Sequence, residues 1–278
     1  MTKKIAFQGA KGAYSDIACR RAYPEWESLP STSFADAFVK TRTGEADLAM
    51  IPIDNTLAGR VADVHRLLPK GGLSIIGEHF QAIHHALVGV KGAKIEDAKH
   101  VHSHVHALPQ CQKLINQYGL ESHVHADTAS AARDVAQWGN KEHVAISSVL
   151  AANLYGLDIL KENIEDEAHN TTRFLVLARE PQDFPFDSSQ KVITSFIFNV
   201  GNIPSALYKA LGGFATNNIQ MAKLESYIDA QFKAAHFYVE VEAHPAEQRF
   251  AYAMAELEFF AKSVQILGSY KADQFRAG

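Results

Sequence analysis

The chain has 278 residues, of which 47% are hydrophobic and 21% are charged, and its formal net charge is −4. This length suits two or three compact domains, because single domains cluster near about 100–150 residues. The chain is slightly acidic and carries no basic run, so it lacks the positive surface that nucleic acid or an anionic membrane would attract, and we expect neither as a partner.

The N-terminal residues and the cysteines bear on the cellular compartment. Gln8, Gly9 and Lys11 interrupt the first apolar run too early for a signal peptide. No stretch approaches the ~18 consecutive apolar residues of a membrane span. Cys19 and Cys111 fit neither a metal-binding spacing nor a disulfide framework, which is typical of a reducing compartment. We therefore expect a soluble, cytoplasmic protein.

Short apolar runs alternate with helical patterns through the first ~180 residues, which predicts an α/β fold with largely parallel strands. Helices are expected between the strands, including one that Asp127 caps at its N-terminus. The expected strands are Lys4–Phe7, Leu48–Ile53, Leu73–Gly77, Ala86–Val90, His100–Ser103, Val124–His125, Val144–Ile146 and Arg173–Ala178.

Polar motifs follow four of the apolar runs. In open α/β sheets, ligands bind beyond the carboxyl ends of the strands, where loops meet helix N-termini. The motifs therefore predict a ligand site, and they are Gln8–Ser15, Asp54–Gly59, Ser103–His106 and Ser147–Ser148.

The last third of the chain has a different order of elements. Glu180–Gln190 contains two prolines and a polar end, which indicates a linker. The expected order after it is that of the ferredoxin-like fold, which by itself implies no function. Its elements are a strand at Val192–Val200, a helix at Ser205–Thr216, strands at Ile219–Tyr227 and His236–Ala243, a helix at Ala246–Ala261 and a strand at Val264–Tyr270.

The segment Asn170–Phe174 places two threonine hydroxyls and an arginine directly before an apolar strand. A guanidinium matches a carboxylate in two parallel hydrogen bonds, and a neighbouring hydroxyl can donate to the same ligand. None of these groups titrates near neutrality. The expected chemistry is hydrogen-bond donation to a departing group and binding of an anion, without a base poised near pH 7. A surface ion pair and ordinary strand residues remain the structural alternative.

Two loops allow both a structural and a ligand-binding interpretation. Gly9–Gly12 could present backbone N–H groups to an anion or form a tight turn. It lacks the third glycine of a dinucleotide fingerprint and the Lys-Ser/Thr ending of a P-loop, so we expect no nucleotide site. Asp54-Asn55-Thr56 could bind a ligand or cap a helix that begins near Arg60.

Histidines alternate at positions 100, 102, 104 and 106, so they would share one face of a strand, as the ligands of a metal site can. A metal site is normally completed by carboxylate or cysteine ligands and by outer hydrogen-bond partners, and this segment does not supply them. We therefore expect no metal.

In their order along the chain, these motifs resemble the prephenate dehydratase family. The matches are Phe7–Ser15, Ile51–Gly59, Ser103–Cys111, Asp127–Ala132 and His143–Leu177, which includes the Thr-Arg-Phe signature at Thr172-Arg173-Phe174. After Lys191 the chain resembles an ACT domain, a small amino-acid-sensing module. The resemblance implies an α/β, two-lobed, periplasmic-binding-protein-like catalytic domain over 1–182, with the second lobe inserted at about 80–164, and an α+β ferredoxin-like ACT regulatory domain over 191–278.

The family's reaction is a carbon–oxygen lyase step in L-phenylalanine biosynthesis that needs no cofactor. Prephenate loses its ring carboxylate as CO2 and its 4-hydroxyl as water, and the product is phenylpyruvate. The resemblance implies that Thr172 is the catalytic donor to the leaving hydroxyl. The implied substrate-binding residues are Arg173, Asn55, Thr56, Ser15, Ser147 and Phe174.

This chain departs from the family pattern at several positions. Asp54 and Thr56 replace the usual Glu and Ser, and Val105-His106 replaces the usual Pro-Gln, which weakens the inference for these positions. Ser205 replaces the Gly of a Gly-Ala-Leu loop, Tyr227-Ile228 replaces the Arg-Pro of a Glu-Ser-Arg-Pro motif, and Gln220 replaces an Asn. The effector-binding residues implied for L-phenylalanine are Ala206, Leu207, Gln220, Glu225 and Ser226.

The resemblance also implies a homodimer or homotetramer. The C-terminal domain could equally be a dimerisation domain that senses no amino acid. Arogenate, which differs from prephenate by an amino group, is an alternative substrate. A non-catalytic small-molecule binding or sensor protein is an alternative of another class, against which the intact Thr172-Arg173-Phe174 argues.

Overall fold

The computed structural model of the chain describes residues 2–201, 204–228 and 234–277. It divides into two compact units, of which the first comprises Met1–Val64 and His79–Leu175 and the second His65–Glu78 and Val176–Gly278. These divisions differ from the expected boundaries at 182 and 191. The reason is that strands β5 (Ser74–Ala82) and β11 (Thr171–Ala178) each continue from one unit into the other.

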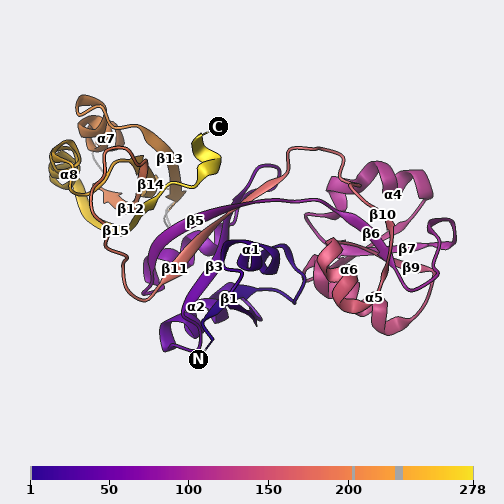
Figure 1. Ribbon diagram of the computed structural model, residues 1–278. Helices are drawn as coiled ribbons and strands as arrows, with labels where there is room; N and C mark the ends of the chain where they lie inside the picture. Colours follow the sequence, from indigo (N-terminus) through magenta and orange to yellow (C-terminus); the bar gives the residue numbers. More distant parts are fainter. Residues whose placement is uncertain (1, 202–203, 229–233, 278) are drawn as a thin grey trace. The chain divides into compact units, whose positions relative to one another are not determined.

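The first sheet contains β1, β3 and the strands around them (Figure 1). Its order is β2-β1-β3-β11-β5, and the short β4 (Gly59–Arg60) pairs with β3. β1 (Lys4–Gln8) is parallel to β2 (Glu27–Ser31) and to β3 (Leu48–Asn55). The helices α1 (Tyr14–Ala22) and α2 (Phe34–Thr43) contact β1 and β3, which explains why these strands are apolar on both faces. α3 (Ala62–Leu67) follows β4.

The second sheet has the order β10-β6-β9-β7-β8. Its strands are β6 (Ala86–Gly89), β7 (His100–His104), β8 (Glu121–His125), β9 (His143–Ser147) and β10 (Asp158–Lys161). The helices α4 (Gln112–Tyr118), α5 (Thr128–Trp138) and α6 (Val149–Tyr155) lie between these strands in the chain. Short 3₁₀ turns occur at Leu68–Lys70, Ile95–Asp97, Leu108–Cys111 and Gln274–Ala277.

The expected cap of α5 is confirmed. The side chain of Asp127 accepts hydrogen bonds from the backbone N–H groups of Ala129 and Ser130, and Ser130 closes the reciprocal capping box. The helix ends at Gly139, which adopts the left-handed conformation that favours glycine. The cap fixes the first turn of α5 beside the loop that follows β8.

The prediction of largely parallel strands is wrong for β6, which is antiparallel to both β9 and β10. It is right for β7, which runs parallel to β8 and β9. β2 and β10 escaped prediction, since Glu27–Ser31 contains a proline and two serines, and Asp158–Lys161 is short with charged ends. Both are outer strands of their sheets, where a strand can be polar.

The second unit has the expected ferredoxin-like order. It runs β12 (Val192–Val200), α7 (Ala206–Thr216), β13 (Met221–Ile228), β14 (Ala234–Glu242), α8 (Gln248–Phe260) and β15 (Ala261–Lys271). The sheet order is β13-β14-β12-β15, and every pair in it is antiparallel. Phe196, Phe214, Val239 and Leu257 belong to one buried cluster between this sheet and the two helices.

An ion-pair network is buried in the second unit. Arg276 pairs with Glu78 at 2.7 Å and with Glu240 at 3.2 Å, and both carboxylate side chains are inaccessible to solvent. The Tyr238 hydroxyl also donates to Glu240. Loss of Arg276 would leave two buried carboxylates without their shared cation, a kind of change that typically costs about 3–5 kcal/mol of stability.

No helix in the described ranges is long and apolar enough to cross a membrane.

Candidate functional site

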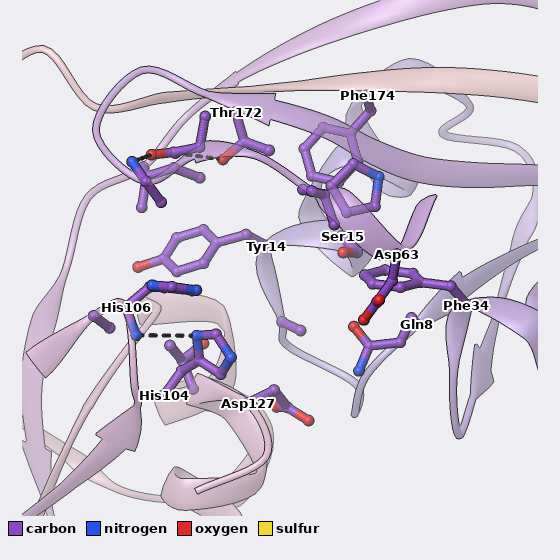
Figure 2. A pocket seen from close by; sticks show the side chains of 18 of the residues that line it. Gln8, Tyr14, Ser15, Phe34, Asp63, His104, His106, Asp127, Thr172 and Phe174 are labelled. Atoms are coloured by element: carbon purple, nitrogen blue, oxygen red, sulfur yellow. Dashed lines mark hydrogen bonds between the residues drawn. The ribbon is translucent and has the colours of Figure 1, made fainter. Parts of the chain in front are cut away.

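A cavity of about 650 Å³ lies within the first unit. Figure 2 shows Thr172 and Phe174 of β11 on one side of it and His104, His106 and Asp127 on the other. Tyr14 and Ser15, from the first turn of α1, also line it. The cavity therefore draws on the ends of strands from both sheets, as the positions of the polar motifs predict, and its size suits a small metabolite.

The Gly9–Gly12 loop is held by contacts with the protein itself. The Gly12 N–H donates to the buried carboxylate of Asp16 at 2.8 Å, and the Gly12 carbonyl accepts from the Ser148 hydroxyl at 2.6 Å. Gly12 has φ +91°, and a Cβ there would lie 2.7 Å from the Cα of Ala151. The glycine thus permits a close approach to α6, and its N–H is not directed at a ligand.

Asn55 orients the hydroxyl of Thr172. The Asn55 Oδ1 accepts from the backbone N–H groups of Leu57 and Ala58, so its amide nitrogen points the other way. That nitrogen donates to Asn170 Oδ1 at 2.7 Å and to Thr172 Oγ1 at 2.9 Å. Since Thr172 Oγ1 accepts here, its hydrogen is available for another acceptor, and no described residue takes it. Thr172 can therefore donate into the cavity.

The same chain of hydrogen bonds continues to Tyr14. Asn170 Nδ2 donates to Gln110 Oε1 at 2.7 Å, and this oxygen also lies 3.0 Å from His85 Nε2, so Nε2 carries a hydrogen. The other ring nitrogen of His85, Nδ1, lies 2.8 Å from the Tyr14 hydroxyl, which donates to the His84 carbonyl at 2.7 Å. These bonds fix the orientation of side chains from α1, the turn before α4 and the start of β11.

Three titratable side chains of this region, Tyr14, His85 and His104, have shifted pKa values. Burial, with Cys111 and Glu165 nearby, raises the pKa of Tyr14 well above its ordinary value. Burial lowers the pKa of His85 despite its hydrogen bond to Gln110. Burial and then His106 lower the pKa of His104. These three groups therefore stay uncharged near pH 7.

Arg173 lies on the other face of β11 from Thr172 and Phe174, since successive side chains of a strand alternate. It is buried, lies 3.8 Å from a carboxylate oxygen of Asp54, and its guanidinium carbon lies 5.9 Å from the ring centre of Phe80. It is not among the described residues that line the cavity. Direct binding of a carboxylate by Arg173 thus stays a prediction.

Of the other expected substrate-binding residues, Ser15, Asn55 and Phe174 line the cavity. Thr56 and Ser147 are not among its described lining residues. The Thr56 hydroxyl donates to the His169 carbonyl and accepts from the Thr171 N–H, so it ties two loops together. The Ser147 hydroxyl is buried and has no hydrogen-bond partner among the described residues.

Several residues of the cavity were not predicted as site residues. Arg60 is the only described lining residue with a permanent positive charge, and it follows the Asp54–Gly59 motif directly. Gln110 and Asn170 lie inside the family-like segments Ser103–Cys111 and His143–Leu177, and this position could have marked them as site residues. Gln8 likewise stands in the first motif, whereas no pattern in the sequence points to His85.

The expected effector residues lie in the second unit. Ala206 and Leu207 begin α7, Gln220 precedes β13, and Glu225 and Ser226 lie in β13. Ser205, the residue before α7, has φ 59°, a left-handed conformation that favours glycine. The replacement of Gly by Ser thus keeps the backbone conformation that a glycine would allow.

Comparisons with known proteins agree with these motifs. The family model "Prephenate dehydratase" matches residues 5–182. A bifunctional N-acyl-homoserine lactone acylase/prephenate dehydratase from Komagataeibacter europaeus is 48% identical over 273 residues, which cover 98% of this chain and 97% of the relative. The chloroplastic arogenate dehydratase/prephenate dehydratase 1 of Arabidopsis thaliana is 39% identical over 288 residues, which cover 98% of this chain and 73% of the relative.

A solved structure is similar over almost the whole chain. The crystal structure of prephenate dehydratase from Arthrobacter aurescens in complex with L-Phe superposes with a TM-score of 0.87 and 27% identity. The similarity covers 96% of this chain and 89% of that chain.

Proposed function

This chain belongs to the prephenate dehydratase family, and on that premise we propose that it converts prephenate to phenylpyruvate, CO2 and water. The observation that carries the proposal is the hydroxyl of Thr172, which accepts a hydrogen bond from Asn55 and is left to donate into the cavity. The cavity volume of about 650 Å³ is ample for a substrate of this size.

The proposed reaction asks little acid–base chemistry of the protein. The bond from the ring to its carboxylate breaks, and its electron pair enters the ring. The bond from C4 to the hydroxyl breaks at the other end, and the hydroxyl leaves as water after gaining one proton, which solvent supplies. Thr172 stabilises this departure by donating a hydrogen bond to the leaving oxygen. Aromatisation of the ring drives the reaction, so neither a metal nor a cofactor is required.

Binding of a dianion requires positive charge and hydrogen-bond donors. Arg60 lines the cavity and can meet one substrate carboxylate. The Ser15 hydroxyl is a further donor within the cavity. Arg173 lies behind β11 beside the carboxylate of Asp54, which offsets much of its charge, so Arg60 is the cation on which the proposed binding of the dianion rests.

Arogenate is a second substrate candidate within the same reaction. The names of the Arabidopsis relative and of a Petunia hybrida relative that is 38% identical include arogenate dehydratase. The amino group of arogenate would be a cation where prephenate carries a keto group. Parallel assays with both compounds decide between them.

An acylase activity is a candidate from a different class. It rests on the relative from Komagataeibacter europaeus, which shares 48% identity along nearly the whole chain and is named for both activities. Incubation of the same purified protein with an N-acyl-homoserine lactone, followed by detection of the released fatty acid, tests this candidate separately.

We further propose that the C-terminal unit acts as an ACT regulatory domain that binds L-phenylalanine in a homodimer or homotetramer. Its ferredoxin-like order supports this proposal, as does the similar solved structure that contains L-Phe. Tyr208, Phe259 and Ile266 are exposed apolar side chains of this unit, and they suit an interface between copies.

The proposed dehydratase function is tested with purified protein and prephenate. Phenylpyruvate absorbs in alkali and is measured directly. We expect its formation to depend on the protein and on Thr172. Saturable binding of prephenate without formation of product would instead favour a binding or sensor protein.

A further inference from the structure

Five histidine rings contact one another on one face of the second sheet. His100 and His102 belong to β7, His123 and His125 to β8, and His143 to β9. The parallel register places His102 opposite His123 and His100 opposite His143. Residues of one parity point to one face, so these rings form a ladder across three neighbouring strands. Glu121, opposite His100, joins the ladder from the outer strand β8.

Three of these side chains, His100, Glu121 and His123, each bring one donor atom within 4.8 Å of the other two. His100 Nδ1 lies 3.1 Å from His123 Nε2 and 3.3 Å from Glu121 Oε2. His123 Nε2 lies 3.7 Å from Glu121 Oε1. Ligands at about 2.0–2.1 Å from a tetrahedral zinc ion lie about 3.3–3.4 Å apart, as the edges of the tetrahedron require. The separation of the two imidazole nitrogens and their separations from Glu121, each to a different carboxylate oxygen, lie on either side of this value. A small rotation of the exposed Glu121 carboxylate therefore brings one oxygen to an ion that both imidazoles hold.

The neighbouring rings hold these ligands in place. The ring of His143 stacks on His100 with centres 4.7 Å apart, and the ring of His102 stacks on His123 with centres 4.8 Å apart. His102 is itself fixed by hydrogen-bond contacts with His125 and His143. Outer partners of this kind orient the ligands of metal sites before the ion arrives.

We propose that His100, Glu121 and His123 form a binding site for a divalent transition-metal ion, with Zn²⁺ as the ion that this donor set fits. Two imidazole nitrogens and one carboxylate oxygen are ligands that zinc accepts. The ligand side chains are 28%, 67% and 38% exposed, so water can complete the coordination. The ion would link β7 to the outer strand β8 and stabilise the edge of the sheet.

The sequence alone did not reveal this set. The alternating histidines of β7 were visible, but their carboxylate partner stands 21 positions further along the chain, in β8. Only the pairing of the two strands brings Glu121 and His123 beside His100. The site uses none of the residues that line the cavity, so the proposal does not depend on the proposed dehydratase function.

Calorimetry with zinc chloride on the full chain tests the proposal after treatment with a chelator and its removal. We expect one saturable site per chain. His123→Gln and Glu121→Gln should weaken it by at least about tenfold, because even outer partners of metal ligands are worth about 10–100-fold. The control is His169→Gln, which removes an exposed imidazole that has no part in the cluster of five rings, and it should keep the site.

Thermal unfolding gives the second readout. Zinc should raise the Tm of the wild type and of His169→Gln, and should not raise the Tm of Glu121→Gln, because an ion stabilises a protein only when it binds the folded state more tightly. Glu121 is exposed and Gln has the same shape, so this variant folds even if His123→Gln does not. Absence of a saturable site in the wild type overturns the proposal. Equal zinc binding by Glu121→Gln and the wild type, or loss of the site in His169→Gln, overturns this ligand set.

Discussion

Thr172 owes its proposed role to the hydrogen bonds of its neighbours. Asn55 is fixed by two backbone N–H groups and donates to Thr172 Oγ1, so the threonine hydrogen is left for the cavity. A hydroxyl oriented in this way is a preorganised donor, which stabilises charge on a leaving oxygen without reorganisation during the reaction. No change in the protonation state of Thr172 is required.

The first prediction concerns this hydroxyl. Thr172→Ala should lower kcat for prephenate by roughly 10²–10³-fold, the usual cost of one preorganised donor. Thr172→Ser keeps the hydroxyl and should retain most of the activity. Thr171→Ala is the matched control, because it removes the neighbouring hydroxyl from the opposite face of β11. Wild-type kcat in Thr172→Ala would exclude Thr172 as the donor.

At the same scale, the sequence predicts chemistry better than orientation. Thr172, Ser15 and Phe174 were predicted from motifs, and all three line the cavity. Arg173 was predicted from the same motif but lies on the opposite face of the strand beside Asp54. His85 and Gln110 reach the site through hydrogen bonds between distant segments, and no local pattern encodes such contacts.

The elements place the functional groups at strand ends. β3 ends at Asn55, β11 begins at Thr171, and α1 begins at Tyr14. Strands β3 and β11 were predicted because each is a run of apolar residues in the sequence. Strands β2 and β10 were not predicted, because short polar strands at a sheet edge lack that pattern. The antiparallel direction of β6 depends on pairing across the sheet, which a run of apolar residues does not specify.

A second prediction follows from the burial of the groups that these elements bring together. The pKa of His85 and that of His104 are lowered, and the pKa of Tyr14 is raised, so none of the three changes charge between about pH 6.5 and 10. The kcat for prephenate should therefore be level between pH 7 and 9. A steady rise or a bell-shaped profile in this range would show that a group near neutrality takes part in the reaction.

At the scale of the whole molecule, a unit with the cavity and a ferredoxin-like unit are joined in one chain. The sequence predicted both folds because their element orders differ, but it could not predict that β5 and β11 would pass from one unit into the other.

Effector binding inhibits an enzyme only if two global states bind the effector differently. This chain departs from the family's effector motifs at Ser205, Gln220 and the Tyr227-Ile228 pair. We therefore expect its affinity for L-phenylalanine to differ from that of relatives that keep those motifs.

The third prediction is that L-phenylalanine binds the full chain and inhibits it. A coupling of about 1–3 kcal/mol corresponds to a rise of about 5–150-fold in the apparent KM for prephenate. Calorimetry measures the binding, with D-phenylalanine as the control ligand and Glu225→Ala as the variant that should weaken it. If millimolar L-phenylalanine gives neither heat nor inhibition, the C-terminal unit acts in assembly alone.

The most direct test of the central proposal is a single turnover assay with purified full-length protein, prephenate and EDTA. We expect phenylpyruvate and CO2 to appear in equal amounts at a rate that EDTA does not change, and we expect this rate to collapse in Thr172→Ala. A protein that binds prephenate but forms no phenylpyruvate, or whose activity is lost with EDTA and restored by a divalent metal, would contradict the proposed reaction at Thr172.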